Sequence, residues 1–204
     1  MAYQYVNKQE TLLGKVYGKT GKISDRTHEE HLKLYSGYVT RANGILKELE
    51  ELAGVIDPAN AAHANQTYSV MRSLKVELPF AVGGIINHEL YFSVLGGTGG
   101  KPEGTIYDLI TRSFGTAEKF FKDLKVSALC ARGWVWTGFD AKTGQLFNYI
   151  GDSQNTFPVW GVKPVLALDM YEHAYFADFF TARGVYIDEF IAHLDWNAVN
   201  ANLL

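Results

Sequence analysis

The sequence predicts an α+β fold: a helical N-terminal domain built on a long helical hairpin, then a C-terminal α/β domain with a small antiparallel sheet. Apolar residues recur at steps of three and four through the first half of the chain, which is the period of an α-helix. The second half contains short apolar stretches that alternate as strands do. A glycine-rich stretch, 96–104, predicts a linker, so we expect domains over 1–95 and 105–204.

The first long helix is predicted to begin near Ser24 and to end near Gly54. Thr27 and Glu30 have the spacing of a capping box at its start. The preceding residues, 1–23, are expected to wrap or extend along the surface, and the sequence assigns them no role. Positions that alternate in steps of four and three should share one buried face of the helix: His31, Tyr35, Tyr38, Ala42, Ile45 and Leu49.

A second helical region is predicted over residues 60–95, with breaks near Pro79 and at Gly83-Gly84. Beyond the linker, residues 105–114 and 116–125 are predicted to be helices. Strands are predicted over 133–139, 145–150 and 165–168, with 140–144 as a hairpin turn between the first two. Helices are expected to close the chain.

Composition narrows the classes of function. The formal net charge is −3 and no cluster of lysine or arginine compensates for it, so we expect no nucleic-acid partner. The longest apolar region, 78–95, is interrupted by Asn87, His88 and Glu89, which predicts no membrane span. The first ten residues lack the apolar run of a signal peptide. A single cysteine, Cys130, excludes an intrachain disulfide, and we expect a cytoplasmic protein.

The stretch from Asp169 to Tyr175 has the pattern of half a metal site. Asp169 follows a short apolar run and His173 lies four residues later, so both side chains can face one ion. This pattern alone is weak. An aspartate at a helix start is usually a cap, and a lone histidine on an apolar segment is usually a hydrogen-bonded core residue. Further ligands would have to come from other elements.

Two more histidines lie in apolar surroundings: His31 on the predicted buried stripe, and His88 after an apolar run. An unpaired buried imidazole is costly, so each requires a partner. One metal ion would satisfy both, together with Asp169 and His173. Three imidazoles and one carboxylate suit iron or manganese better than a closed structural zinc site. His28 is an alternative to His31, or else a solvated surface histidine; helical phase favours His31.

Seven ordered segments resemble the iron/manganese superoxide dismutases, and the match spans about Ser24 to the C-terminus. Seven segments in order are far more specific than any one of them. The resemblance implies superoxide as a small-molecule substrate and one Mn or Fe ion per subunit. The segments are His31 to Asn43, Asn87-His88, Gly99 to Gly104, Phe114-Gly115, Gly133 to Trp136, Gln154-Asn155 and Asp169 to Tyr175.

The resemblance also implies roles for individual residues. Gln154 would be the active-site glutamine, and Gly84 stands at the other place from which this family supplies it. That arrangement is typical of manganese members, so manganese is slightly preferred. The metal ligands would be His31, His88, Asp169 and His173.

The remaining implied residues surround these ligands. Tyr38 would be the gateway to the site, but it lies seven residues after His31, where the familiar members have eight. Unless a π-bulge accounts for this difference, Tyr35 is a rival gateway. Trp134, Trp136 and Tyr171 would line the pocket, Arg183 would stand near the anion entrance, and Glu172 and Tyr175 would bridge the subunits of a homodimer or tetramer.

Two other functions compete with dismutation. A non-haem iron oxygenase also mixes histidine and carboxylate ligands, but it should show two histidines and leave room for an organic substrate. A structural or interaction protein on the same fold would have lost its metal ligands, whereas candidates for all four are present. Because a fold does not by itself establish a function, the geometry of the site has to decide.

Overall fold

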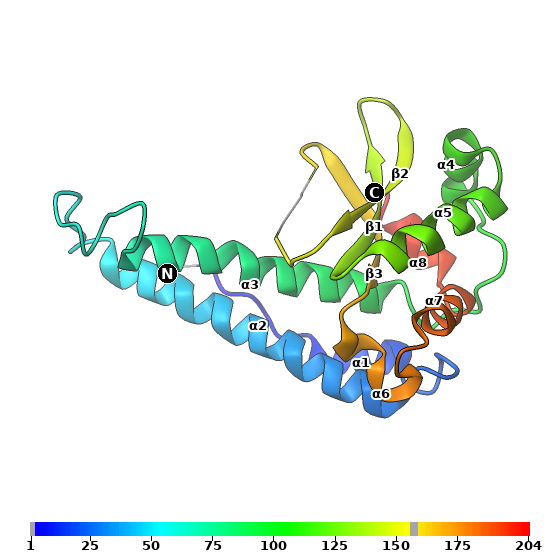
Figure 1. Ribbon diagram of the computed structural model, residues 1–204, viewed down its shortest axis with the longest axis horizontal. Coiled ribbons are helices and arrows are strands. Elements are labelled where there is room, and N and C mark those ends of the chain that lie inside the picture. The colour runs from blue at the N-terminus through cyan, green and yellow to red at the C-terminus, as the bar shows by residue number, and fades with distance from the viewer. Residues whose placement is uncertain (1–2, 156–158) are drawn as a thin grey trace.

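Two long helices, α2 (Asp25–Leu52) and α3 (Val70–Ser93), lie side by side as a hairpin, with the short helix α1 (Gln9–Val16) packed against both near one end (Figure 1). The computed structural model describes residues 3–155 and 159–204. A three-stranded sheet and short helices form the rest of the described chain. These are α4 (Thr105–Phe114), α5 (Ala117–Cys130), β1 (Trp134–Asp140), β2 (Gln145–Gly151), β3 (Val162–Asp169), the 3₁₀ turn η1 (Glu172–Ala174), α6 (Phe176–Phe179), α7 (Arg183–Ala192) and α8 (Trp196–Ala201).

Helix α2 begins one turn earlier than a capping box at Thr27 would require. The side chain of Ser24 accepts a hydrogen bond from the Thr27 backbone N–H, so Ser24 is the N-cap and the predicted capping box is wrong. Glu30 instead pairs with Arg26 and Lys33 on the exposed face. The helix is α-helical from Asp25 to Leu52, so it needs no π-bulge to bring its polar residues inward.

Helix α3 runs without interruption through Pro79 and Gly83-Gly84, so the predicted breaks are wrong. It begins at Val70, capped by the Ser69 side chain, and residues 60–69 form turns. A proline inside a helix removes one hydrogen bond, at a cost of about 3 kcal/mol. Packing of α3 along both α2 and β3 offsets that cost, because it buries the inward face of the helix.

The N-terminal residues do more than extend along the surface. Residues 9–16 form α1, which places Leu12 and Val16 in the hydrophobic core. The arm before α1 is held against α2: the side chain of Asn43 both accepts from and donates to the backbone of Tyr5, at 2.8 and 2.9 Å. The expectation of an extended arm holds for this part, and the helix that follows it was not predicted.

The sheet has the strand order β2-β1-β3, and both pairings are antiparallel. The β1–β2 hairpin turns over residues 141–144, close to the predicted turn over 140–144. Strand β3 begins three residues earlier than predicted and includes Pro164, which an edge strand tolerates because its outer side needs no ladder hydrogen bond. The register pairs Trp134 with Asp169, the last residue of β3. Because α3 packs against β3, the sheet delivers Asp169 to the side that faces α3.

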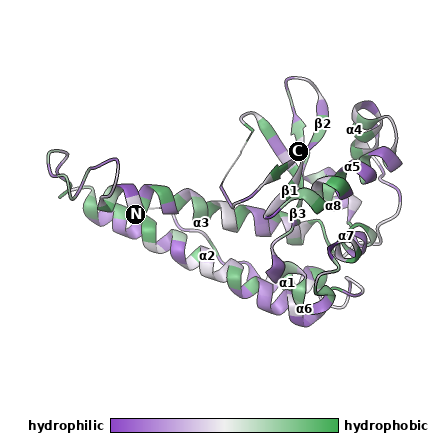
Figure 2. Ribbon diagram, in the orientation of Figure 1, coloured by the Kyte–Doolittle hydropathy of each residue, from purple (hydrophilic) through white to green (hydrophobic). Residues whose placement is uncertain are grey.

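Helix α4 has the predicted bounds, and α5 extends five residues beyond its predicted end. Figure 2 shows hydrophilic and hydrophobic residues mixed along α2 and α3. Within the part of the chain that the structure describes, no helix combines the length and apolar character needed to cross a membrane.

Candidate metal centre

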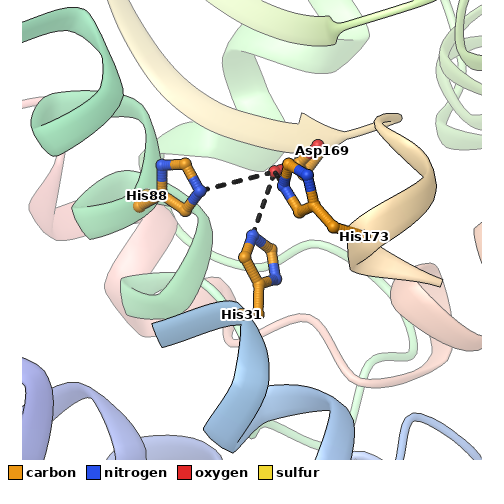
Figure 3. Close-up of side chains that lie close together, drawn as sticks. All are labelled: His31, His88, Asp169 and His173. Carbon is orange, nitrogen blue, oxygen red and sulfur yellow. Dashed lines mark hydrogen bonds and ion pairs between the residues drawn. The ribbon is translucent and has the colours of Figure 1, made fainter. Parts of the chain in front are cut away.

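Four side chains from four elements converge at one point (Figure 3). His31 comes from α2, His88 from α3, Asp169 from the end of β3 and His173 from η1. One potential ligand atom of each lies within 4.8 Å of the others. Among residues 3–155 and 159–204 this is the single such group of three or more histidine, cysteine or acidic side chains. The two halves of the chain thus meet at a site that neither half contains alone.

The carboxylate of Asp169 is the centre of this cluster. Its Oδ2 lies 3.1 Å from His31 Nε2, 3.2 Å from His173 Nε2 and 3.8 Å from His88 Nε2. Its Oδ1 accepts from the Tyr171 backbone N–H at 2.9 Å, as the strand ends. His31, His88 and Asp169 have fully buried side chains, whereas the His173 side chain is 27% exposed. Three candidate ligands are therefore closed off from solvent, and the fourth faces partly outward.

The ring of His88 has a defined orientation. Its Nδ1 lies 2.6 Å from the carbonyl oxygen of Gly84, so Nδ1 carries the proton and donates. The other nitrogen, Nε2, is left with a lone pair, is buried and has no hydrogen-bond partner. A lone pair that faces a carboxylate is repelled by it, and a cation between the two removes the repulsion. The orphaned nitrogen therefore fits a metal site and fits a purely structural core poorly.

The protonation states favour a cation as well. Burial lowers the pKa of His88 to about 3 and also lowers the pKa of His31, although the Asp169 carboxylate opposes the shift at His31. Burial alone would raise the pKa of Asp169, but His173 and His31 outweigh it and hold that pKa below its usual range. At neutral pH these residues are two neutral imidazoles and an ionised carboxylate, the forms that bind metal.

The distances also fit one ion. Metal–nitrogen and metal–oxygen bonds of about 2.0–2.2 Å place two neighbouring ligand atoms roughly 3–4 Å apart. The separations between Asp169 Oδ2 and the three imidazole nitrogens fall in that range. The set contains nitrogen and oxygen donors without sulfur, which suits iron or manganese.

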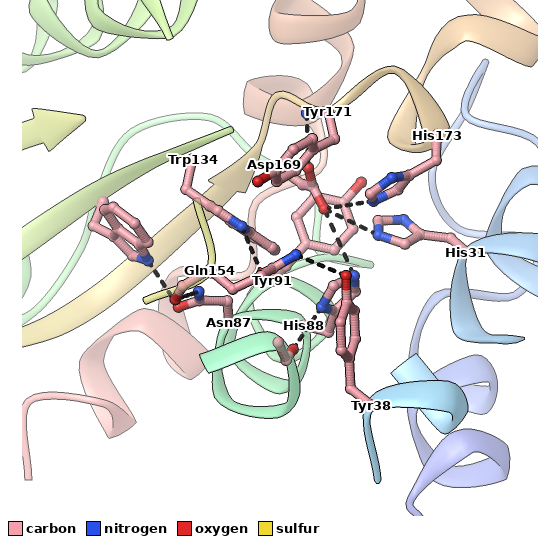
Figure 4. Close-up of polar contacts among 12 residues, drawn as sticks. His31, Tyr38, Asn87, His88, Tyr91, Trp134, Gln154, Asp169, Tyr171 and His173 are labelled. Atoms are coloured by element: carbon pink, nitrogen blue, oxygen red, sulfur yellow. Dashed lines mark hydrogen bonds and ion pairs between the residues drawn. The ribbon is translucent and has the colours of Figure 1, made fainter. Parts of the chain in front are cut away.

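Gln154 lies beside the cluster, in the segment that follows β2 (Figure 4). Trp134 Nε1 donates to Gln154 Oε1 at 2.9 Å, and Gln154 Nε2 donates to Tyr38 Oη at 3.1 Å. The Trp134 ring also meets the His88 ring edge-on, with centroids 5.2 Å apart. Gln154 is 5% exposed, so this network is shielded from bulk solvent.

The two candidate gateway tyrosines face different regions. The Tyr38 ring lies 5.5 Å from the His88 ring and its hydroxyl meets Gln154. Tyr35 is buried and donates to the carboxylate of Glu89, while its oxygen accepts from the Lys8 backbone N–H. Tyr35 therefore ties the N-terminal arm to the hairpin, and its hydroxyl faces away from the cluster. In a continuous α-helix, the seven-residue spacing from His31 keeps Tyr38 on the ligand face.

His28 is buried and lies outside the cluster, so its reading as a surface histidine is wrong. The Thr20 hydroxyl donates its one proton to the Ile23 carbonyl, so His28 Nε2 donates to the Thr20 oxygen, at 2.7 Å. Burial and the neighbouring His31 lower the pKa of His28 to about 4. Its neutral ring is partnered by a hydroxyl group instead of a carboxylate.

The other predicted residues lie around the cluster. Tyr171 stacks on His173 with ring centroids 5.4 Å apart, and Trp136 stacks against Trp134 at 6.3 Å. Tyr175 is buried against Tyr186, whereas Glu172 is exposed. The roles predicted for these side chains stay predictions.

Arg183 is the first residue of α7, and its side chain reaches the C-terminal end of α5. Its guanidinium donates to the carbonyl oxygens of Ala128 and Ala131. It also acts on Tyr175: burial raises the pKa of that phenol, and the positive charge of Arg183 partly opposes the rise. The predicted place of Arg183 near an anion entrance stays a prediction.

The sequence predicted no contact with Gln154 or Tyr38 for three residues that make one. Asn87, next to His88, donates to the Gln154 backbone carbonyl. A Cβ atom at Gly83 would lie 2.3 Å from the same carbonyl oxygen, and one at Gly84 would lie 2.5 Å from the Tyr38 ring. The sequence did contain a signal, since a glycine pair inside an apolar helix often marks close packing.

Comparison with known proteins places the chain in a class. Residues 102–202 match the iron/manganese superoxide dismutases, C-terminal domain. A superoxide dismutase (Fe) of Aquifex aeolicus (strain VF5) is 36% identical over 180 residues, covering 87% of this chain and 83% of that protein. A superoxide dismutase (Mn/Fe) of Rickettsia typhi (strain ATCC VR-144 / Wilmington) is 32% identical over 184 residues, covering 85% and 81%.

A further relative is the superoxide dismutase (Mn) of Mycolicibacterium smegmatis (strain ATCC 700084 / mc(2)155), 30% identical over 185 residues, covering 89% of this chain and 80% of that protein. The chain belongs to the iron/manganese superoxide dismutase family. The names of these relatives include iron, manganese and both, so membership does not fix the metal.

Proposed function

We propose that this chain is a superoxide dismutase, which converts two superoxide anions and two protons into dioxygen and hydrogen peroxide. One observation carries the proposal: three imidazoles from separate elements converge on a buried carboxylate in a member of this family. A bound iron or manganese ion would supply the redox chemistry by alternating between trivalent and divalent states, taking an electron from one superoxide and giving it to the next.

His31, His88, Asp169 and His173 would hold this ion. Neutral imidazoles and one carboxylate give the donor set a charge of −1, so the site keeps a net positive charge with either a divalent or a trivalent ion. That local charge attracts a small anion, although the whole chain carries −3. Superoxide would therefore be drawn to the site against the mildly repulsive field of the protein.

Gln154 and Tyr38 would handle the protons that peroxide formation needs. The Tyr38 oxygen accepts a hydrogen bond from Gln154, so the hydroxyl proton of Tyr38 is free to be donated elsewhere. Burial raises the pKa of Tyr38, although the Gln154 hydrogen bond partly opposes the shift. The hydroxyl group is therefore protonated at neutral pH and can pass a proton into the site, to be replaced from solvent.

Tyr38 would also be the gateway, because it lies beside His88 and Gln154, whereas the Tyr35 hydroxyl is engaged with Glu89. The rings of Trp134, Trp136 and Tyr171 would line the pocket and restrict it to small molecules.

These contacts also weigh against the two competing functions. An oxygenase needs room for an organic substrate and is expected to have two histidines, and here three converge. A structural protein would have no reason to retain all four ligands.

The preferred metal is a separate part of the proposal. Manganese is slightly preferred, because the glutamine comes from the segment after β2 while Gly84 leaves the alternative position empty and packs against Tyr38. The names of the relatives support both metals. The test is to purify the protein without added metal, measure the bound metal, refill the metal-free protein with each ion, and assay dismutation. A fully loaded protein that is inactive with both ions would refute the function.

We also propose a homodimer whose contact passes near Glu172 and His173. Glu172 is exposed, and it would accept from the ring nitrogen of the partner's His173 that does not bind metal. Glu172→Ala should weaken dimerisation and metal retention together. A metal-loaded monomer in sedimentation experiments with the parent protein would refute this contact. The tetramer and the cytoplasmic location stay predictions from the sequence.

A further inference from the structure

The backbone of Gln154 rests directly on helix α3. Its carbonyl oxygen accepts from Asn87 Nδ2 at 3.0 Å. One turn earlier, the same oxygen occupies the space that a side chain at Gly83 would fill, because a Cβ there would lie 2.3 Å away. Gly83 is helical, so it is needed for space and not for an unusual backbone angle. Asn87 and Gly83 together form a seat for the Gln154 carbonyl.

The direction of this hydrogen bond is fixed by a neighbouring tryptophan. Trp136 Nε1 donates to Asn87 Oδ1 at 3.1 Å, and an indole nitrogen can only donate. The oxygen of the Asn87 amide must therefore face Trp136, and its NH₂ group must face Gln154. Both amides and the Trp136 ring are at least 93% buried, so water does not compete for these bonds.

A second tryptophan fixes the orientation of a second amide in the same way, beside the candidate metal ligands (Figure 4). Trp134 Nε1 donates to Gln154 Oε1, which turns the NH₂ group of Gln154 toward Tyr38. Both sets of hydrogen bonds end at Gln154. The bonds from Trp136 through Asn87 fix its backbone, and the bond from Trp134 fixes its side chain. Gln154 lies beyond the end of β2, where no strand ladder holds the backbone. Its reach toward Tyr38 therefore depends on the seat.

We propose that Asn87 is a positioning residue for Gln154, with Gly83 supplying the space and Trp136 the orientation. Asn87 holds the Gln154 backbone where the side-chain amide of Gln154 can bond both Trp134 and Tyr38. This inference rests on the proposed function for the role of Gln154 in dismutation, but the placement of Gln154 is a property of the protein without metal.

The first test uses that property. In the metal-free protein, the indole N–H signal of Trp134, one of four tryptophans, is assigned by loss of the signal in Trp134→Phe. Asn87→Ala and Gly83→Ala should both move this signal toward its position in Gln154→Ala, because Trp134 loses its acceptor. The matched control is Asn148→Ala, which removes a β2 amide that bonds Thr137 and Asp123 away from Gln154. The control should leave the signal in place.

The second test uses the metal-loaded protein. Asn87→Ala should keep its metal and lower dismutation about 10-fold or more, the size of effect seen when outer contacts of a metal site are removed. Adding Asn87→Ala to Gln154→Ala should cause no further loss, since both act through one group.

An unchanged Trp134 signal in folded Asn87→Ala and Gly83→Ala variants would overturn the proposal, as would additive losses in the double variant. If one variant fails to fold, the other decides. A parent protein without dismutase activity would refute the proposed function, while the indole signal would still decide the positioning role.

Discussion

Two buried polar regions lie one helical turn apart along α2, and they differ in how their histidines are satisfied. In the first region, His28 donates to the hydroxyl of Thr20, which donates onward to a backbone carbonyl. In the second, His31 and two other imidazoles face the carboxylate of Asp169. Each region holds a buried ring nitrogen without a hydrogen-bond partner, Nδ1 in His28 and Nε2 in His88, and that of His88 lies 3.8 Å from a carboxylate oxygen.

This difference indicates what separates a candidate metal ligand from a histidine of the core. His28 and His31 are both buried on α2, so the helical phase that favoured His31 in the sequence does not separate them in the structure. The separating property is the partner: the ring of His28 meets a neutral hydroxyl, whereas the three imidazoles of the second region face an ionised carboxylate. A cation bound among these side chains would satisfy both the carboxylate and the lone pair of His88. Substitutions in the two regions should therefore differ in what they remove, either the metal or only stability.

Removal of the charge at the centre of the cluster should have the largest effect. Asp169→Ala takes away the carboxylate that all three imidazoles face, so the affinity for metal should fall by more than about 100-fold and dismutation should be lost. Metal content after refilling, measured together with activity, checks this. His173→Ala should behave in the same way. Full occupancy in either variant would contradict the assignment of the ligands.

The two histidines of α2 should respond in opposite ways. His31→Ala should lose the metal and the activity. His28→Ala should keep both but should lower the free energy of unfolding by about 1–3 kcal/mol, because it leaves the buried Thr20 oxygen without its donor. Metal analysis and urea unfolding separate the two outcomes. If His28→Ala lost the metal while His31→Ala retained it, the contrast between the two regions would be reversed.

Gln154→Ala should have a smaller effect than loss of a ligand. The variant should keep its metal, because the Gln154 side chain bonds Tyr38 and Trp134. It makes no hydrogen bond to any of the four candidate ligands. Dismutation should fall about 10- to 100-fold, since the hydrogen bond that orients Tyr38 is gone. Steady-state rates at equal metal content provide the measurement. An unchanged rate would mean that the catalytic glutamine is wrongly assigned.

The smallest effect concerns acid stability. The pKa of His28 is about 4 in the folded protein and 6.5 when unperturbed, chiefly because the ring is buried. Between these values the unfolded chain binds a proton that the folded protein does not. The stability that depends on a neutral His28 is therefore complete above about pH 6.5. The free energy of unfolding then falls as the pH drops toward 4, with a slope of up to about 1.4 kcal/mol per pH unit.

His28→Gln removes this titration. Urea unfolding of the metal-free protein between pH 7 and pH 4 should therefore show a shallower loss of stability in the variant than in the parent. The same measurement extended above pH 7 should give parallel pH dependences for the two proteins, which serves as the internal control. Equal slopes in the acid range would show that His28 is accessible to protons in the folded protein.

Much of the fold could be predicted because it follows from local patterns. The stripe on α2, the β1–β2 hairpin and the bounds of α4 depend on nearby residues, and the structure agrees with them. The continuity of α3 through Pro79 could not be predicted, because packing against α2 and β3 overrides the local preference of a proline. For the same reason α1 was missed, since its short apolar face is stabilised by the hairpin beneath it.

In the candidate site, too, some residues could be predicted from the sequence and others could not. The four ligands could be proposed because histidines and aspartates in apolar surroundings are rare and need partners. The family resemblance supplied Gln154 and Tyr38. The seat formed by Gly83 and Asn87 could not be predicted, because it depends on a close approach between α3 and the segment after β2, 67 residues further along the chain from Asn87. Sequence spacing holds no information about such a distance.

The central claim is that one iron or manganese ion is held by His31, His88, Asp169 and His173. Anomalous diffraction from crystals of the refilled protein, collected at the absorption edges of both metals, tests this claim most directly. The account predicts one strong peak per chain, within bonding distance of the Nε2 atoms of the three histidines and of an Asp169 carboxylate oxygen. A peak coordinated by His28 or Glu30, or no peak at the cluster in a protein that dismutes superoxide, would contradict it.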